Sequence, residues 1–105
     1  MDNWGFLGAR DVIIAGVKCL AVRISYTGEL GWELYPHMGD MVTVYQALVQ
    51  HGADLNLGHV GTRVINTCRI EKGFRAWGRE MNKDVSPIEA GLMPFVRMNK
   101  KVSEI

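Results

Sequence analysis

The chain has 105 residues, which is enough for one small domain. Hydrophobic residues make up 48% of it, a share that favours a packed core and argues against intrinsic disorder. The formal net charge of +1 argues against a dedicated nucleic-acid or membrane binder, and no stretch reaches the roughly 18 apolar residues of a membrane-spanning helix.

Short apolar runs near the start of the chain predict antiparallel strands. Residues 12–16 (VIIAG) form the first run and residues 17–25 (VKCLAVRIS) the second, with Gly16-Val17 between them at a tight hairpin. Residues 31–35 (GWELY) predict the next strand.

The middle of the chain shows helical periodicity. Asp40 is a suitable N-cap and Gly52 a suitable end for a helix of about 12 residues. Its apolar positions recur at helical spacing and predict the apolar stripe of an amphipathic helix: Met41, Val44, Tyr45 and Leu48, widened by Val42 and Val49. A second helix is predicted to begin at Thr62 as its cap and to end near Lys72.

The remainder is expected to be irregular over residues 74–87 and to close with a strand over residues 94–98. Strands followed by helices predict an α+β fold, in which an antiparallel sheet carries two helices on one face. We expect residues 1–105 to be a single, partial domain.

The cysteines and histidines argue against a metal site. Cys19 and Cys68 are far apart and show no metal-binding spacing, so they predict buried thiols in a reducing, non-secretory compartment. We assign none of the three histidines to catalysis or to metal binding.

Three motifs in order give the chain a resemblance to a known family. SYTGELGWELY, then CRIEKGFRAWGREMN, then PIEAGL resemble the aminomethyltransferase-like region of the glycine-cleavage T-protein superfamily. T-proteins carry GYTGE and RLEAG at the first two places. The RIEKGFRAWG segment is more similar to the flavin-dependent dimethylglycine and sarcosine dehydrogenases, dimethylglycine dehydrogenase above all.

The resemblance implies tetrahydrofolate as the cofactor and one-carbon transfer as the chemistry. Such regions pass the carbon released from an N-methylated glycine to folate. The family's catalytic aspartate precedes the region seen here and no flavin-binding GxGxxG occurs, so FAD belongs to the parent protein and we expect no catalytic residue in this chain. The expected partners are folate and the upstream part of the parent chain, in the mitochondrial matrix or the cytoplasm.

The same resemblance places the pterin-binding acid on Glu33. A pterin presents N3–H and its 2-amino group as two parallel donors, and a carboxylate can accept both. Glu29, at the tip of the turn, is the competing acid, and a third alternative is that neither acid binds folate. Tyr26 is either a folate contact or a half-buried strand residue, and Trp32 is either a stacking surface or a core residue.

The arginines leave the folate tail unassigned. T-proteins hold the tail with an arginine that corresponds here to Ile65. Arg63, Arg75 and Arg79 are alternative tail partners, although exposed arginines are by default solvated surface. Arg69 and Glu71 are expected to form ion pairs that fix the end of this helix, and Glu89 is expected to cap or stabilise a turn.

Two functions from different classes remain open. The first is a tetrahydrofolate-binding part of a dimethylglycine or sarcosine dehydrogenase-type protein. The alternative is a non-catalytic interaction domain like the pyruvate dehydrogenase phosphatase regulatory subunit, which shares the architecture. In either case unpaired apolar strands predict a homo-oligomer through residues 12–25 or 94–98.

Overall fold

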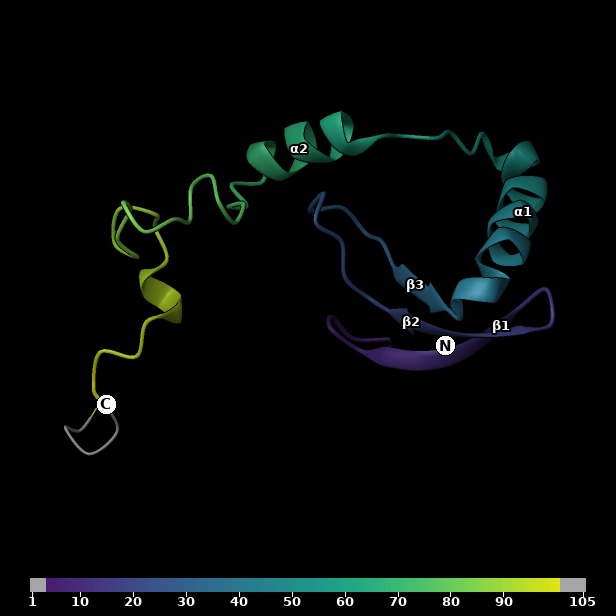
Figure 1. Cartoon of the computed structure of the whole chain (residues 1–105), viewed down its shortest axis with the longest axis horizontal. Helices are drawn as coiled ribbons and strands as arrows, with labels where there is room; N and C mark the ends of the chain where they lie inside the picture. Colours follow the sequence, from purple (N-terminus) through teal and green to yellow (C-terminus); the bar gives the residue numbers. More distant parts are fainter. Residues whose placement is uncertain (1–3, 101–105) are drawn as a thin grey trace. The chain divides into compact units, whose positions relative to one another are not determined.

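A computed structural model describes residues 4–100 and confirms the α+β class (Figure 1). The chain divides between Lys72 and Gly73 into two compact units, each of which is described by itself below. All strands and α-helices of the described residues belong to the first unit: β1 (Ala9–Ile14), β2 (Val17–Val22), β3 (Glu33–Pro36), α1 (Met41–Gly52) and α2 (Thr62–Glu71). Short 3-10 turns cover Met38–Asp40, Ala53–Leu55 and Met93–Phe95.

The sheet is an antiparallel meander in the order β1-β2-β3. Burial alternates along β2: Cys19 and Ala21 are 1% and 2% exposed, whereas Lys18 and Leu20 point to solvent. Because directly paired residues share a face, the pairing of Leu20 with Tyr35 puts that tyrosine on the exposed face. The sheet therefore has one covered and one open face.

The β1–β2 turn lies one residue earlier than predicted, at Ala15-Gly16. Ile14 pairs with Val17, and the two residues between them have φ values of 49° and 79°. Positive φ at both central positions is the geometry of a type I′ turn, which matches the twist of the flanking strands. Glycine adopts this conformation freely, but Ala15 does so at a steric cost.

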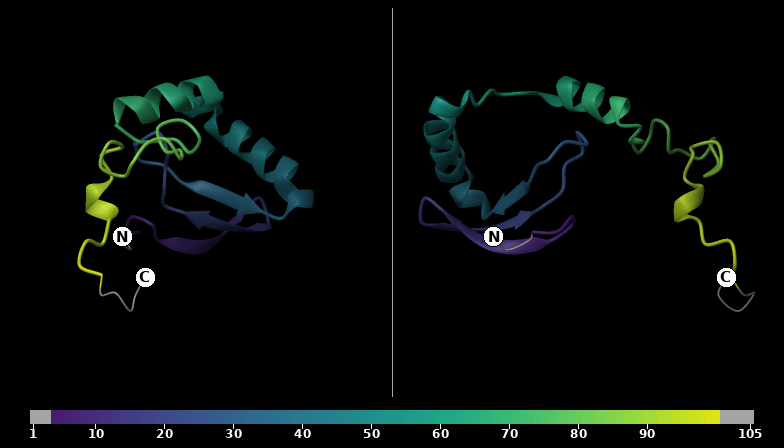
Figure 2. Two further views of the ribbon diagram at one scale, coloured as in Figure 1. Left: turned by 60° about the vertical axis from the view of Figure 1, so that its left-hand side comes forward. Right: turned by 180° about the vertical axis from the view of Figure 1, so that it is seen from behind.

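The two helices lie on the same side of the sheet (Figures 1 and 2). The helix predicted from Asp40 to Gly52 is confirmed as α1. Of its apolar stripe Val44 is buried at 3% exposure, whereas four other members are exposed: Met41, Val42, Tyr45 and Leu48. No described part of the chain covers the apolar surface that these four side chains of α1 present. Gly61 rather than Thr62 is the N-cap of α2, and the Asp40 side chain makes no capping bond.

The second unit is held by local turns. The irregular structure predicted for residues 74–87 is confirmed, but the strand predicted for residues 94–98 is wrong, because Met93–Phe95 forms a 3-10 turn. Pro94 explains the difference, since its fixed φ and missing N–H suit a first helical turn and weaken a strand. Glu89 accepts hydrogen bonds from the Ser86 amide and hydroxyl, which confirms the predicted turn tie.

Within residues 4–100, no helix is both long enough and apolar enough to cross a bilayer.

Candidate functional site

The first acid of interest, Glu33, opens β3 on the exposed face of the sheet. Tyr35 follows two residues later, on the same face, and its hydroxyl donates a hydrogen bond to Glu33 Oε2. This bond raises the pKa of Tyr35 above its usual value, with smaller contributions from desolvation and from the Glu33 charge. Among residues 4–100 no cation forms an ion pair with Glu33. The carboxyl group is therefore oriented by Tyr35, paired with no described cation and open to solvent.

Three further predicted residues come from the connection between β2 and β3. Strand β2 ends at Val22, so the strand predicted to reach Ser25 is shorter, and Tyr26, Glu29 and Trp32 all precede β3. The connection is braced by its own hydroxyl groups, because Ser25 Oγ and Thr27 Oγ1 lie 2.7 Å apart and the Glu29 amide donates to Thr27 Oγ1. Tyr26 is part-exposed within this braced segment.

Glu29 does not stand alone at the tip of the connection. Its carboxylate lies 3.0 Å from Nζ of Lys72, the residue that follows α2. The aliphatic part of Lys72 packs directly over Gly28, where a Cβ would collide with it, and the φ of Gly28 is +77°. The ion pair is solvent-exposed and stabilises the fold only weakly, but it offsets the charge of Glu29. Glu33 is the acid without such a counter-charge.

Trp32 is a surface residue rather than a core residue. It is 44% exposed and meets Trp4 edge-on, with ring centroids 5.9 Å apart. Arg10 lies 5.2 Å from the centre of the Trp4 ring. An edge-on aromatic pair with an adjacent guanidinium forms a partly exposed aromatic surface beside the start of β3.

Two of the three arginines predicted to hold an anionic tail, Arg63 and Arg75, differ in their surroundings. Arg63 lies in the first turn of α2, and within the described part of the chain nothing pairs with its guanidinium. Arg75, in the second unit, donates hydrogen bonds to the carbonyl oxygens of Gly73, Ala90 and Gly91. Arg75 therefore ties the backbone of the second unit, a structural role that the sequence did not indicate.

Arg69 is buried in the last turn of α2. It is 1% exposed, and its guanidinium donates to Oδ1 of Asn66 through both Nε and Nη2. The side chain is thus held inside the last turn of α2 by Asn66, and the ion pairing expected at this helix end stays a prediction.

Two residues of the site were missed by sequence reasoning. Tyr35 was detectable, because residues two apart on a strand share a face and Tyr35 stands two positions after Glu33. Lys72 was not detectable in the same way, since its partner lies 43 positions earlier in the chain (72 − 29) and no local pattern links the two.

Comparison with known proteins agrees with the three motifs. The family model described as the GCVT N-terminal domain matches residues 1–100. The mitochondrial dimethylglycine dehydrogenase of Mus musculus is 48% identical over 99 residues, which cover 94% of this chain and 11% of that protein. The human mitochondrial sarcosine dehydrogenase is 45% identical over 78 residues, which cover 74% of this chain and 8% of that protein.

A shorter relative shares the same region. The aminomethyltransferase of Alkaliphilus metalliredigens is 39% identical over 93 residues, covering 89% of this chain and 25% of that protein. The chain thus spans between about a tenth and a quarter of the length of these relatives. The resemblance to the T-protein superfamily and to the dehydrogenases is confirmed, and the chain belongs to the GCVT N-terminal domain family.

Proposed function

We propose that this chain forms part of a tetrahydrofolate-binding site that receives a one-carbon unit from an N-methylated glycine. The observation that carries the proposal is the Glu33 carboxylate, which Tyr35 orients on the open face of the sheet and no described cation neutralises. The names of the relatives, dehydrogenases of methylated glycines and aminomethyltransferases, support the same chemistry.

The chemistry of recognition follows from the carboxylate. Each carboxylate oxygen accepts up to two hydrogen bonds, so Oε2 can keep the Tyr35 hydroxyl while both oxygens accept N3–H and the 2-amino group of a pterin. The adjacent Trp32–Trp4 pair offers an aromatic edge beside that position. Tyr26 and Arg63 are further candidates for contact with the ring and the tail, whereas Glu29 is the weaker candidate because Lys72 offsets its charge.

The chain's own residues position folate in this proposal and do not start the chemistry. In a dehydrogenase-type parent, a flavin would oxidise the amine, and folate held by Glu33 would capture the carbon released. Holding two reactants together in this way lowers the barrier by several kcal/mol. The relatives named as mitochondrial favour the matrix as the compartment.

The substitution Glu33→Gln tests the proposal. The glutamine amide keeps one oxygen acceptor but places its NH2 group against an N–H donor of the pterin. We therefore expect the affinity for tetrahydrofolate to fall at least about tenfold, as for the loss of a charge-assisted hydrogen-bond pair. Isothermal titration calorimetry under argon on the 105-residue chain measures the affinity directly.

Glu71→Gln, the same chemical change at an exposed position at the end of α2, is the matched control and should bind as the original chain does. Equal affinity for the Glu33 and Glu71 variants would remove Glu33 from the site. A loss confined to Glu29→Gln would move the site to the competing acid.

A further inference from the structure

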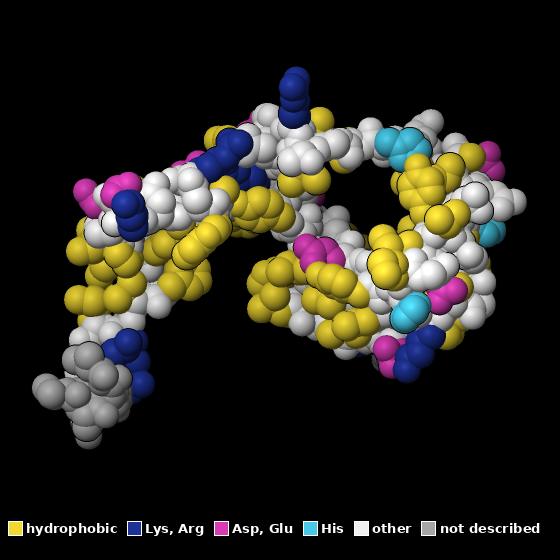
Figure 3. Space-filling model, in the orientation of Figure 1, with side chains coloured by type: hydrophobic (Ala, Val, Ile, Leu, Met, Phe, Trp, Pro, Cys, Tyr) yellow, Lys and Arg dark blue, Asp and Glu magenta, His cyan; other side chains and the backbone are white. Residues whose placement is uncertain are grey.

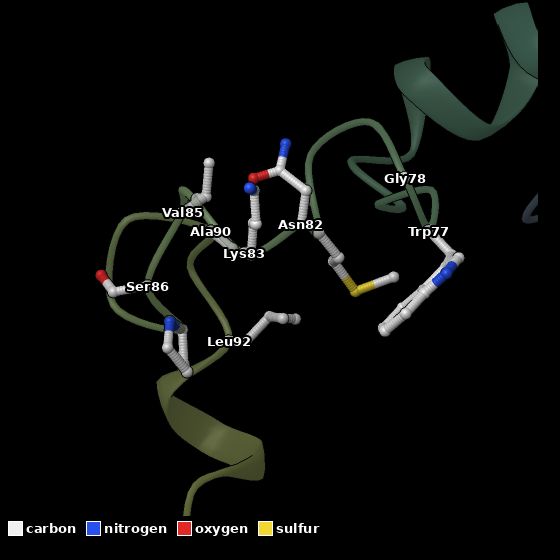
Figure 4. A pocket seen from close by; sticks show the side chains of 10 residues that line it. Trp77, Gly78, Asn82, Lys83, Val85, Ser86, Ala90 and Leu92 are labelled. Carbon is white, nitrogen blue, oxygen red and sulfur yellow. The ribbon is translucent and has the colours of Figure 1, made fainter.

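The second unit contains a cavity of about 560 Å³ (Figure 4). This volume lies within the range of small-molecule sites. Trp77 is the largest side chain that lines it, and the indole is 87% exposed. Trp77 and Leu92 reach toward the same space in Figure 4, and Met81, Val85 and Pro87 add to the apolar lining. Its walls suit a flat, apolar ring.

The backbone around the cavity is firmly held although it has no regular structure. Trp77 and Met81 form a β-bridge, and the Gly78 amide donates to the Met81 carbonyl. Glu80 accepts a hydrogen bond from the Ala76 amide, and Arg75 ties Gly73 to Ala90 and Gly91. The backbone that carries the exposed indole is thus held by hydrogen bonds. Less conformational entropy is therefore lost when a ring binds against Trp77.

The polar groups of the lining identify the charge of the ligand. The Asn82 amide is engaged by the Arg79 carbonyl and the Asp84 amide, and the Ser86 hydroxyl is engaged by Glu89. Lys83 is the one charged residue of the lining, and within residues 4–100 no hydrogen bond or ion pair engages its ammonium group. An apolar cavity with one unneutralised cation complements an aromatic anion.

We propose that this cavity binds a small aromatic carboxylate, with its ring against Trp77 and its carboxylate toward Lys83. Aromatic surfaces stack in offset or edge-to-face geometry on an indole, and the ammonium group adds a preference for the charged ligand. The inference goes beyond the proposed folate function and does not rest on it, since no residue of the cavity belongs to the candidate site on β3.

A pair of matched probes tests the proposal. 2-Naphthoate and 2-naphthylmethanol carry the same ring, with and without the negative charge, and are titrated into the ¹⁵N-labelled chain by NMR. We expect shifts at the Trp77 indole and the Met81 and Leu92 amides, with naphthoate bound about two- to fivefold more tightly than the alcohol. Trp77→Ala should weaken both probes about tenfold.

Lys83→Met removes the positive charge and keeps an unbranched side chain, so it tests the charge without disturbing the fold. It should bring the ratio of the two affinities to about one, whereas Lys18→Met, in the first unit, should leave the ratio unchanged. Phe95→Ala, which removes an equally exposed aromatic outside the lining, should leave both affinities unchanged. Shifts outside residues 77–92, or an unchanged ratio in Lys83→Met, would overturn the proposal. Glu33→Gln should not alter naphthoate binding, so the two proposals can fail independently.

Discussion

Tyr35 and Glu33 lie two residues apart on one strand, and each changes the chemistry of the other. The carboxylate holds the proton on the phenol, and the phenol fixes one oxygen of the carboxylate. The motif identified Glu33, but Tyr35 needed the strand register, which puts positions 33 and 35 on the same exposed face. The pairing of Glu29 with Lys72 needed the three-dimensional structure, because nothing local in the sequence relates a loop to a distant helix end.

This pair predicts a measurable titration. Glu33→Gln removes the charge and the strongest acceptor, so the pKa of Tyr35 should fall back toward its ordinary value of 10.0. Because the folded pKa is raised, the bond's contribution to stability is complete below the unfolded pKa and is lost as the pH rises through the folded one. The ¹³Cζ shift of Tyr35, followed by NMR through alkaline pH, measures this pKa in the variant and in the original chain.

Glu29→Gln is the control for this titration, since Glu29 is paired with Lys72 and makes no bond to Tyr35. An identical Tyr35 titration in the Glu33 variant and in the original chain would show that the hydrogen bond is absent in solution.

At the level of the elements, apolar periodicity predicted both helices at nearly their observed bounds. Short apolar runs predicted the first two strands, and the aromatic segment GWELY predicted the third. The type I′ turn was displaced by one residue because Gly16 was expected to open the turn, whereas register places it second, after Ala15. The prediction of a final strand was wrong, because Pro94 favours a 3-10 turn although the residues around it are apolar. The backbone preferences of single residues decided these boundaries, and hydrophobic periodicity carries no information about such preferences.

The turn predicts a stabilising substitution. Ala15 has a φ of 49°, a left-handed conformation that costs alanine more than asparagine. Ala15→Asn creates the Asn-Gly pair that type I′ turns favour and should raise the free energy of unfolding by about 0.5–1 kcal/mol. Urea denaturation followed by circular dichroism measures the change. Ala15→Val, which places a β-branched side chain in the same conformation, should lower it; a gain in stability with valine would contradict the turn assignment.

Across the first unit, apolar side chains are far more often exposed than buried. Cys19, Ala21 and Val44 are its buried apolar residues among those described, while the visible surface carries broad hydrophobic areas (Figure 3). Sequence composition predicted a packed core but could not show how many of the apolar side chains these residues bury. Strand β1 adds an unpaired edge to this surface, with Ile13 68% exposed.

We therefore expect the 105-residue chain to self-associate through the free edge of β1. Sedimentation equilibrium at micromolar concentration should show a species heavier than 11.8 kDa. Ile13→Lys places a charge beside that edge and should shift the equilibrium toward monomer, whereas Lys83→Met, which lies in the second unit, should not. A monomer with a cooperative melt would show that the chain is self-sufficient and that its strand edges do not pair.

The simple order of the sheet has a consequence for the speed of folding. Each strand pairs with its neighbour in the sequence, so the search for β1-β2-β3 needs only short loops to close. The contact between Lys72 and Glu29 joins residues much farther apart and can form only after α2 has reached the β2–β3 connection. We therefore expect the hairpin to assemble first and the loop that precedes Glu33 to reach its final conformation late, so that the candidate folate site is among the last parts of the first unit to mature.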